Sequence, residues 1–128
     1  MKNIFLALMI GVFFLPQLSF GAIDPQLMAF NQQEDAKAHE FFTGQAQERA
    51  EFIKTHQELI AKLDAKGQEI MRQKNGDKSL HPPAEPLTSD ESSTWSAFTS
   101  KQQADKSVFM AQLNQDRQQF LSSHPGTN

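Results

Sequence analysis

Two segments of the chain carry the same side chains at the same spacing, and these side chains could bind an anion. Arginine, phenylalanine and histidine recur at positions i, i+3 and i+7 in QERAEFIKTH (47–56) and in QDRQQFLSSH (115–124). On a helix, this spacing places all three on one side. The candidate polar residues are Arg49, His56, Arg117 and His124. The alternative, which the residue types favour, is structural: arginine pairs with neighbouring acids, and a histidine near a helix C-terminus is stabilised by the helix dipole.

The other histidines and the carboxylates form no recognisable catalytic or metal-binding motif. No two of the 4 histidines are separated by four residues, as in a helical zinc motif. The chain also has no cysteine and no nucleophile motif of the G-x-S-x-G type. We therefore predict a protein that is not an enzyme and holds no cofactor. A small metal- or anion-binding protein, with a site shared between subunits, is an alternative that the sequence leaves open.

The first residues, MKNIFLALMIGVFFLPQLSFGA, have the layout of a cleavable secretory signal. Lys2 supplies the positive charge, an uncharged apolar run of 12 residues follows from Ile4 to Leu15, and small residues stand at Ser19 and Gly21. The apolar run is too short for a membrane span, which needs about 20 residues. The sequence predicts a signal peptide over residues 1–21, export to the bacterial periplasm or medium, and no stable membrane anchoring after cleavage.

Charge and composition exclude several classes of partner. Cleavage would remove Lys2 alone among the charged residues, so the net charge would change from −3 to −4. This acidic balance argues against nucleic-acid binding, which needs a basic surface. The chain is long enough for one small domain, and without cysteine no disulfide can stabilise it. Its richness in Gln, Glu, Lys and Ala favours helix over strand.

Helix start and stop signals divide the rest of the chain. Asp24 and Pro25 are typical of a helix N-terminus, and no proline follows until residue 82. We predict a first helical region over 22–74, a proline-rich linker over 75–88, a second helix over 89–124 and a disordered tail over 125–128. Thr88 and Glu91 predict a capping box at the second helix. Gly44 is the expected position of a kink or break in the first.

Large apolar residues recur every eleven positions in both helical regions. Eleven residues make about three helical turns with a drift of about 20°, so each series keeps to one side of its helix. The series form a packing ladder of Phe41, Phe52 and Leu63 in the first region and Phe98, Phe109 and Phe120 in the second, with Phe30 preceding the first series. The two series, like the duplicated segments, are related by an offset of 68 residues.

These patterns predict an all-α fold, an antiparallel helical hairpin of two long helices, or of three if the first breaks near Gly44. Packing the ladders against each other predicts contacts between positions whose numbers add to 161, namely Leu63 with Phe98, Phe52 with Phe109 and Phe41 with Phe120. In that register Leu27, Met28 and Phe30 have no partner in the chain, which makes them a candidate interface. A hairpin has a narrow core, so we also predict a homo-oligomer.

The function that best fits these expectations is an exported, non-enzymatic helical protein of the bacterial envelope. It would self-associate and contact protein or peptide partners through exposed apolar helix surface, as a chaperone or adaptor does. An alternative is a secreted amphipathic protein that acts on membranes or competitor cells. The acidic balance of the chain disfavours that alternative.

Overall fold

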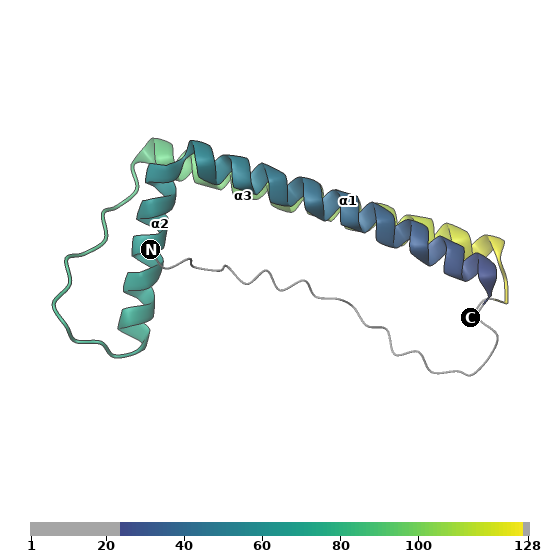
Figure 1. Cartoon of the computed structure of the whole chain (residues 1–128), viewed down its shortest axis with the longest axis horizontal. Helices are drawn as coiled ribbons and strands as arrows, with labels where there is room; N and C mark the ends of the chain where they lie inside the picture. The colour runs from purple at the N-terminus through teal and green to yellow at the C-terminus, as the bar shows by residue number, and fades with distance from the viewer. Residues whose placement is uncertain (1–23, 127–128) are drawn as a thin grey trace.

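The computed structural model describes residues 24–126, and within them the chain forms three helices and no strand. Helix α1 spans Pro25–Thr55, α2 spans Gln57–Lys74 and α3 spans Ser89–Ser123. Figure 1 shows α1 and α3 side by side along their lengths, with α2 turning away from them at one end. The prediction of an all-α chain is confirmed. The predicted signal peptide, 1–21, and the last two residues of the predicted tail lie outside the described residues.

The helix ends form where the sequence signals place them. The Asp24 carboxylate accepts a hydrogen bond from the backbone N–H of Gln26 at 2.8 Å, and Pro25 occupies the first turn. At α3, the Thr88 hydroxyl accepts from the Glu91 backbone N–H at 3.1 Å. The Glu91 carboxylate in turn accepts from the Thr88 backbone N–H at 2.8 Å. The predicted capping box is therefore confirmed.

The expected break at Gly44 is wrong, because α1 runs through Gly44 without interruption and ends at Thr55. The chain bends at His56, which is both the C-cap of α1 and the residue before α2. Side chains compete with the helical hydrogen bonds at this point. The Thr55 hydroxyl donates to the carbonyl of Glu51 at 2.9 Å, and the His56 ring contacts the carbonyl of Phe52 through Nδ1 at 3.0 Å. A threonine bond of this kind can bend a helix, but α3 continues through the same bond from Thr99 to Trp95, so the His56 contacts are what set this point apart.

The ladders do pack on each other, but in a different register from the predicted one. Stacked phenylalanines join α1 to α3 at three levels, and in each pair the residue numbers add to 150 rather than 161. The pairs are Phe30–Phe120, Phe41–Phe109 and Phe52–Phe98, with ring centroids 4.4, 4.1 and 4.0 Å apart. We call these three pairs the aromatic ladder. Leu63, the last predicted rung of the first helical region, lies on α2 instead.

The phenylalanine pairs and the charged side chains together explain why the predicted register is wrong. A shift of eleven residues superimposes one phenylalanine level on the next, but only the observed register pairs all six phenylalanines, since the predicted one would leave Phe30 unpaired and set Phe98 against Leu63. In the observed register, Lys37 pairs with Asp116 at 2.8 Å and Lys101 pairs with Glu48 at 3.1 Å. In the predicted register Asp116 would lie at the level of Glu48, where two carboxylates would repel each other. In the observed register Asp116 and Glu48 instead each form an ion pair with a lysine, Lys37 and Lys101 respectively.

The offset of 68 residues gives the α1/α3 pair an approximate two-fold symmetry. Adding 68 to each position of α1 converts Phe30, Phe41 and Phe52 into Phe98, Phe109 and Phe120. The same operation subtracts 68 from each position of α3. It therefore exchanges the pair Phe30–Phe120 with the pair Phe52–Phe98, and it leaves the pair Phe41–Phe109 unchanged. The two-fold axis thus passes through the central pair of the ladder, at right angles to both helices.

The fold has almost no enclosed core. Among residues 24–126, Leu59 is the only buried apolar side chain, and Gln102 is the only buried polar one. All six ladder rings are half-buried, since each is covered by one facing helix. No helix in this part of the chain combines the length and the apolar character that crossing a membrane requires.

Candidate binding surface

Polar clusters fill the spaces between the levels of the aromatic ladder. Between the outer pair Phe30–Phe120 and the central pair, the Lys37 ammonium bonds to Glu34 at 2.7 Å and to Asp116 at 2.8 Å. These bonds raise the pKa of Lys37, and the bond that Lys37 donates to Asp116 has the largest effect. The pKa of the Asp116 carboxyl is lowered in turn, first by Lys37 and then by the Gln112 amide.

A second cluster lies between the central pair and Phe52–Phe98. Gln102 is its centre: its carbonyl accepts from the Gln45 amide at 2.9 Å, and its own amide donates to Glu48 at 2.9 Å. Lys101 bonds to Asp105 and to Glu48, and these contacts raise its pKa, that from Asp105 most. Every buried side-chain nitrogen and oxygen in the described chain has a partner. The clusters therefore join α1 to α3 in the observed register, and no buried polar side-chain atom in the described residues is left unpaired.

The two duplicated segments adopt the same local structure at opposite ends of the α1/α3 pair. The His56 ring stacks on Phe52 with centroids 4.2 Å apart, and the His124 ring stacks on Phe120 at 4.4 Å. In both, the ring Nδ1 lies 3.0 Å from the phenylalanine carbonyl, and the backbone N–H donates to the same oxygen. The duplicated histidines thus act as C-caps, one at the end of α1 and the other at the end of α3.

The arginines of the duplicated segments do not join their histidines in a site. Arg49 approaches the Gln102 side-chain oxygen at 3.5 Å, a long contact from α1 to α3. Arg117 is exposed on α3. Because the two segments end at opposite ends of the pair, their basic groups do not converge. No group of three His, Asp or Glu residues within 24–126 is placed to hold a metal ion.

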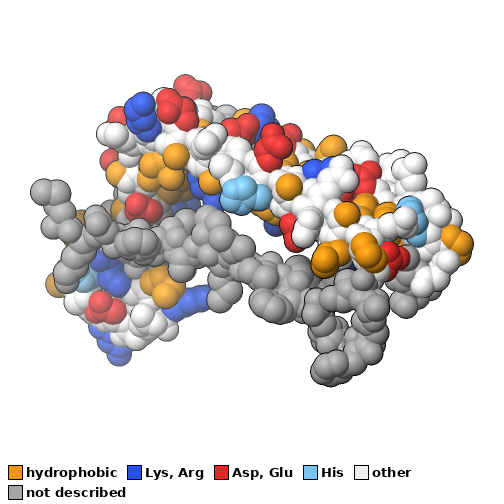
Figure 2. All heavy atoms as spheres, turned by 45° about the vertical axis from the view of Figure 1, so that its right-hand side comes forward, with side chains coloured by type: hydrophobic (Ala, Val, Ile, Leu, Met, Phe, Trp, Pro, Cys, Tyr) orange, Lys and Arg blue, Asp and Glu red, His pale blue; other side chains and the backbone are white. Residues whose placement is uncertain are grey.

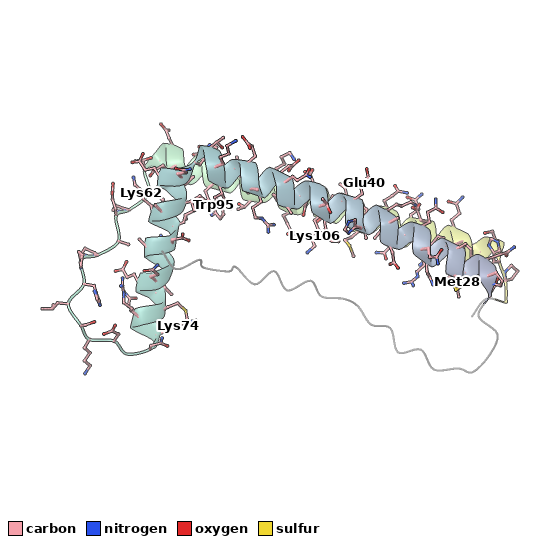
Figure 3. All side chains as sticks on the ribbon, viewed as in Figure 1. Met28, Glu40, Lys62, Lys74, Trp95 and Lys106 are labelled. Atoms are coloured by element: carbon pink, nitrogen blue, oxygen red, sulfur yellow. The ribbon has the colours of Figure 1, made fainter. Side chains whose placement is uncertain are left out.

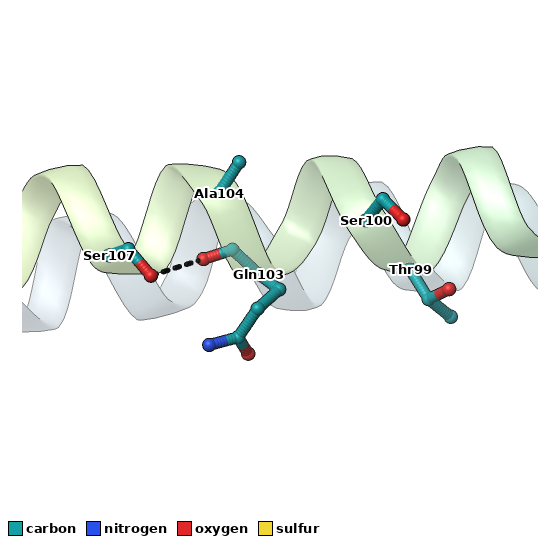
Figure 4. Close-up of a pocket in the computed structure, with 5 residues that line it drawn as sticks. All are labelled: Thr99, Ser100, Gln103, Ala104 and Ser107. Carbon is teal, nitrogen blue, oxygen red and sulfur yellow. Dashed lines mark hydrogen bonds between the residues drawn. The ribbon is translucent and has the colours of Figure 1, made fainter.

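The surface depression on α3 offers no catalytic side chains either. It is lined by Thr99, Ser100, Gln103, Ala104 and Ser107, all from a single helix (Figure 4). The Ser107 hydroxyl donates to the carbonyl of Gln103 at 3.0 Å, which is an ordinary contact within a helix. No residue of this set is acidic, basic or a histidine, so the depression has no group for acid-base work.

The predicted interface at the start of α1 is only partly available. Phe30 stacks on Phe120 in the same chain, so it is not the unpartnered residue that the predicted register implied. Leu27 is half-buried, whereas Met28 remains exposed. The observed register brings the start of α1 level with the end of α3, which removes the overhang.

A larger apolar surface lies on one side of the α1/α3 pair, and the sequence patterns did not identify it. Phe42, Ile53, Met110 and Leu121 each follow a ladder phenylalanine directly, so each side chain is turned by about 100° from the ladder. Because α1 and α3 run in opposite directions, an equal turn on both brings these side chains to the same side of the pair. Met28 shares this side. We call these five residues the apolar flank, and they are 40% to 46% exposed.

The figures agree with this placement. In Figure 3, Met28 and Lys106 lie on the side of the pair toward which α2 turns, whereas Glu40 lies on the other side. Hydrophobic side chains reach the surface in several patches in Figure 2. The opposite side carries Glu40, Gln47 and Glu51 from α1 and Lys101, Val108 and Gln115 from α3, so it is mostly polar.

No family model, no curated protein and no solved structure matches the chain.

Proposed function

We propose that the chain is an exported, non-enzymatic protein of the bacterial envelope that self-associates and binds protein or peptide partners through apolar helix surface. Its role would be that of a chaperone, an adaptor or a structural component. The leader-like sequence of residues 1–21 supports export. The polar clusters between the ladder levels support a non-enzymatic role, since they pair acids with bases across two helices rather than gathering them in a cleft.

One observation carries the proposal: the described chain buries a single apolar side chain and leaves nine large ones exposed. The exposed residues are Met28, Phe42, Ile53, Ile70, Met71, Leu80, Val108, Met110 and Leu121. Full burial of one such side chain stabilises a protein or complex by roughly 1.5–3 kcal/mol. A two-helix pair lacks the core that a small domain needs, so association with another surface is the expected source of the missing burial.

The test combines sedimentation with binding of a hydrophobic dye by the purified protein. We expect the weight-average mass to rise with protein concentration, and the fluorescence of an anilinonaphthalene dye to rise on binding. A protein that stays monomeric at all concentrations and does not bind the dye would remove the basis of the proposal. Flotation with phospholipid vesicles is the control for a membrane-acting protein, and we expect the protein to stay in the dense fractions.

A further inference from the structure

We propose that the apolar flank is the dimer interface, and that a second copy packs its own apolar flank against it with the long axes antiparallel. This inference rests on the proposed self-association, and it adds the surface and the orientation. The result would be a four-helix arrangement in which α1 lies against α1 of the second copy and α3 against α3. Helices of such bundles pack at small angles to one another, which suits two straight pairs.

The symmetry of the flank favours an identical partner. Phe42 and Met110 are related by the offset of 68 residues, as are Ile53 and Leu121. The flank is thus approximately two-fold symmetric about the Phe41–Phe109 level, with Phe42 and Met110 at its centre. In an interface between identical chains the same patch serves both partners and must be complementary to itself. A flank with apolar residues at its centre and at both ends meets this condition.

The position of α2 selects the antiparallel orientation. For the four long helices alone, the approximate symmetry makes a parallel and an antiparallel arrangement equivalent. Helix α2 removes this equivalence, because it turns toward the apolar flank at one end of its own pair (Figures 1 and 3). In the parallel arrangement both α2 helices would crowd the same end of the dimer. In the antiparallel one, each α2 lies beyond the far end of the other copy.

Charges and side chains then match across the interface. Antiparallel α1 helices centred on Phe41 bring residues together whose numbers add to about 82. Met28 lies opposite Ile53 of the second copy. Phe42 meets Phe42 of the second copy close to the two-fold axis of the dimer. Asp35, which shares the side of Ile53, comes opposite Arg49 of the second copy. An acid facing a base, rather than a like charge, supports this register.

The cysteine-free chain allows a direct test by single-cysteine crosslinking. Phe42→Cys is the interface variant. Val108→Cys is the matched control, because Val108 lies at the same level of the pair, on the opposite side, and is more exposed at 71%. Under mild oxidation we expect the F42C protein to form a disulfide-linked dimer at least about 10 times faster than the V108C protein. Equal rates for the two would overturn the proposed surface.

Mixing two single-cysteine proteins tests the orientation. We expect M28C mixed with I53C to give the mixed dimer in preference to either self-linked dimer. A preference of M28C for L121C instead would indicate the parallel arrangement and overturn the antiparallel one.

Sedimentation separates this inference from the proposed function. We expect the double variant Phe42→Ser/Met110→Ser to dissociate at least about 100-fold more readily than the wild type, and V108S to match the wild type. If the double variant associates normally, the flank is excluded while self-association stands. A wild-type monomer that still binds apolar peptide would overturn the dimer and leave partner binding in place.

Discussion

At the scale of single residues, the aromatic ladder is the main source of tertiary contact in the described chain. Its central pair, Phe41 and Phe109, is stacked at 4.1 Å with the ring planes 6° apart, and Phe42 adds an edge contact to Phe109 at 6.1 Å. Phe109 therefore contacts two aromatic rings of α1 at the centre of the ladder. A substitution there removes both contacts at once.

We predict that Phe109→Ala lowers the free energy of unfolding by roughly 2–4 kcal/mol, because it removes a large packed ring together with its aromatic contacts. Urea denaturation followed by circular dichroism would measure the change. Val108→Ala is the control, since Val108 is exposed on the mostly polar side and its loss should change stability by less than about 0.5 kcal/mol. Equal effects of the two substitutions would show that the ladder does not hold α1 and α3 together.

The ion pair between Lys37 and Asp116 predicts how stability depends on pH. Lys37 lowers the pKa of the Asp116 carboxyl below its ordinary value of 3.8. A carboxyl with a lowered pKa in the folded state stabilises the fold above its unfolded pKa, and this contribution is lost as the pH falls through the folded pKa. We expect the wild type to lose stability below about pH 4. The D116N protein should lack this part of the loss.

The pH effect is also expected to weaken in salt, because Lys37 is partly exposed and exposed ion pairs are screened. Denaturation at several pH values, with and without added salt, would measure both effects. A D116N protein with the same acid-induced loss as the wild type would assign that loss to other carboxyls, such as Glu91. The pKa of Glu91 is lowered mainly by its bond from the Thr88 backbone N–H.

At the scale of helices, the sequence predicts that a helix forms and where its capped ends lie better than it predicts where the helix is interrupted. Asp24, Pro25, Thr88 and Glu91 act through local hydrogen bonds, and these are specified by neighbours in the chain. The break at His56 is different. Glycine has a low helix propensity, which points to Gly44, but propensity is a weak signal where a facing helix supplies packing. The capping contacts of His56 at the end of α1 cannot be recognised until the ladder is known to end there.

Gly44 gives a prediction that tests the continuity of α1. A Cβ atom added at Gly44 would meet no atom within 4 Å, and Gly44 lies in the interior of a helix. We therefore expect Gly44→Ala to raise the free energy of unfolding by roughly 0.5–1 kcal/mol. Thermal and urea unfolding would measure this gain.

Two other glycines serve as controls for that measurement. Gly67 is interior to α2 with equally open surroundings, so Gly67→Ala should also stabilise. Gly76 has φ of 68°, which favours glycine, so Gly76→Ala should destabilise. A loss of stability in the G44A protein would mean that the chain needs a flexible joint at that point.

At the scale of the whole molecule, periodicity fixes which residues face the other helix but not which level they meet. The eleven-residue repeat makes registers that differ by eleven similar, although only the observed one pairs all six ladder phenylalanines. Polar residues such as Lys37, Asp116 and Gln102, whose contacts span α1 and α3, add to this preference. The apolar flank escaped the sequence analysis for a related reason. It becomes a common surface only after two antiparallel helices are placed side by side.

A distance measurement between α1 and α3 can determine the register of the two helices. A shift of eleven residues would displace α3 along α1 by about 16 Å. Gln33 and Gln119 are exposed, lie on the same side of the pair and stand at nearly the same level in the observed register. We expect nitroxide labels on Q33C/Q119C to be close together. Labels on Q47C/Q115C should be farther apart along the helix axis by about 18 Å.

In the predicted register, where the numbers of paired residues add to 161, the order would be reversed. The labels of Q47C/Q115C would then be close and those of Q33C/Q119C separated. Charge reversal makes the measurement sharper, because the ion pairs also distinguish the two registers. Exchanging Lys37 for Asp and Asp116 for Lys in one protein preserves the pair and should preserve the short Q33C/Q119C distance. Lys37→Asp alone sets two carboxylates opposite each other in the observed register. It should therefore weaken the observed register and broaden the distance distribution, and an unchanged narrow distribution would show that the Lys37–Asp116 pair is not needed to set the level at which the helices meet.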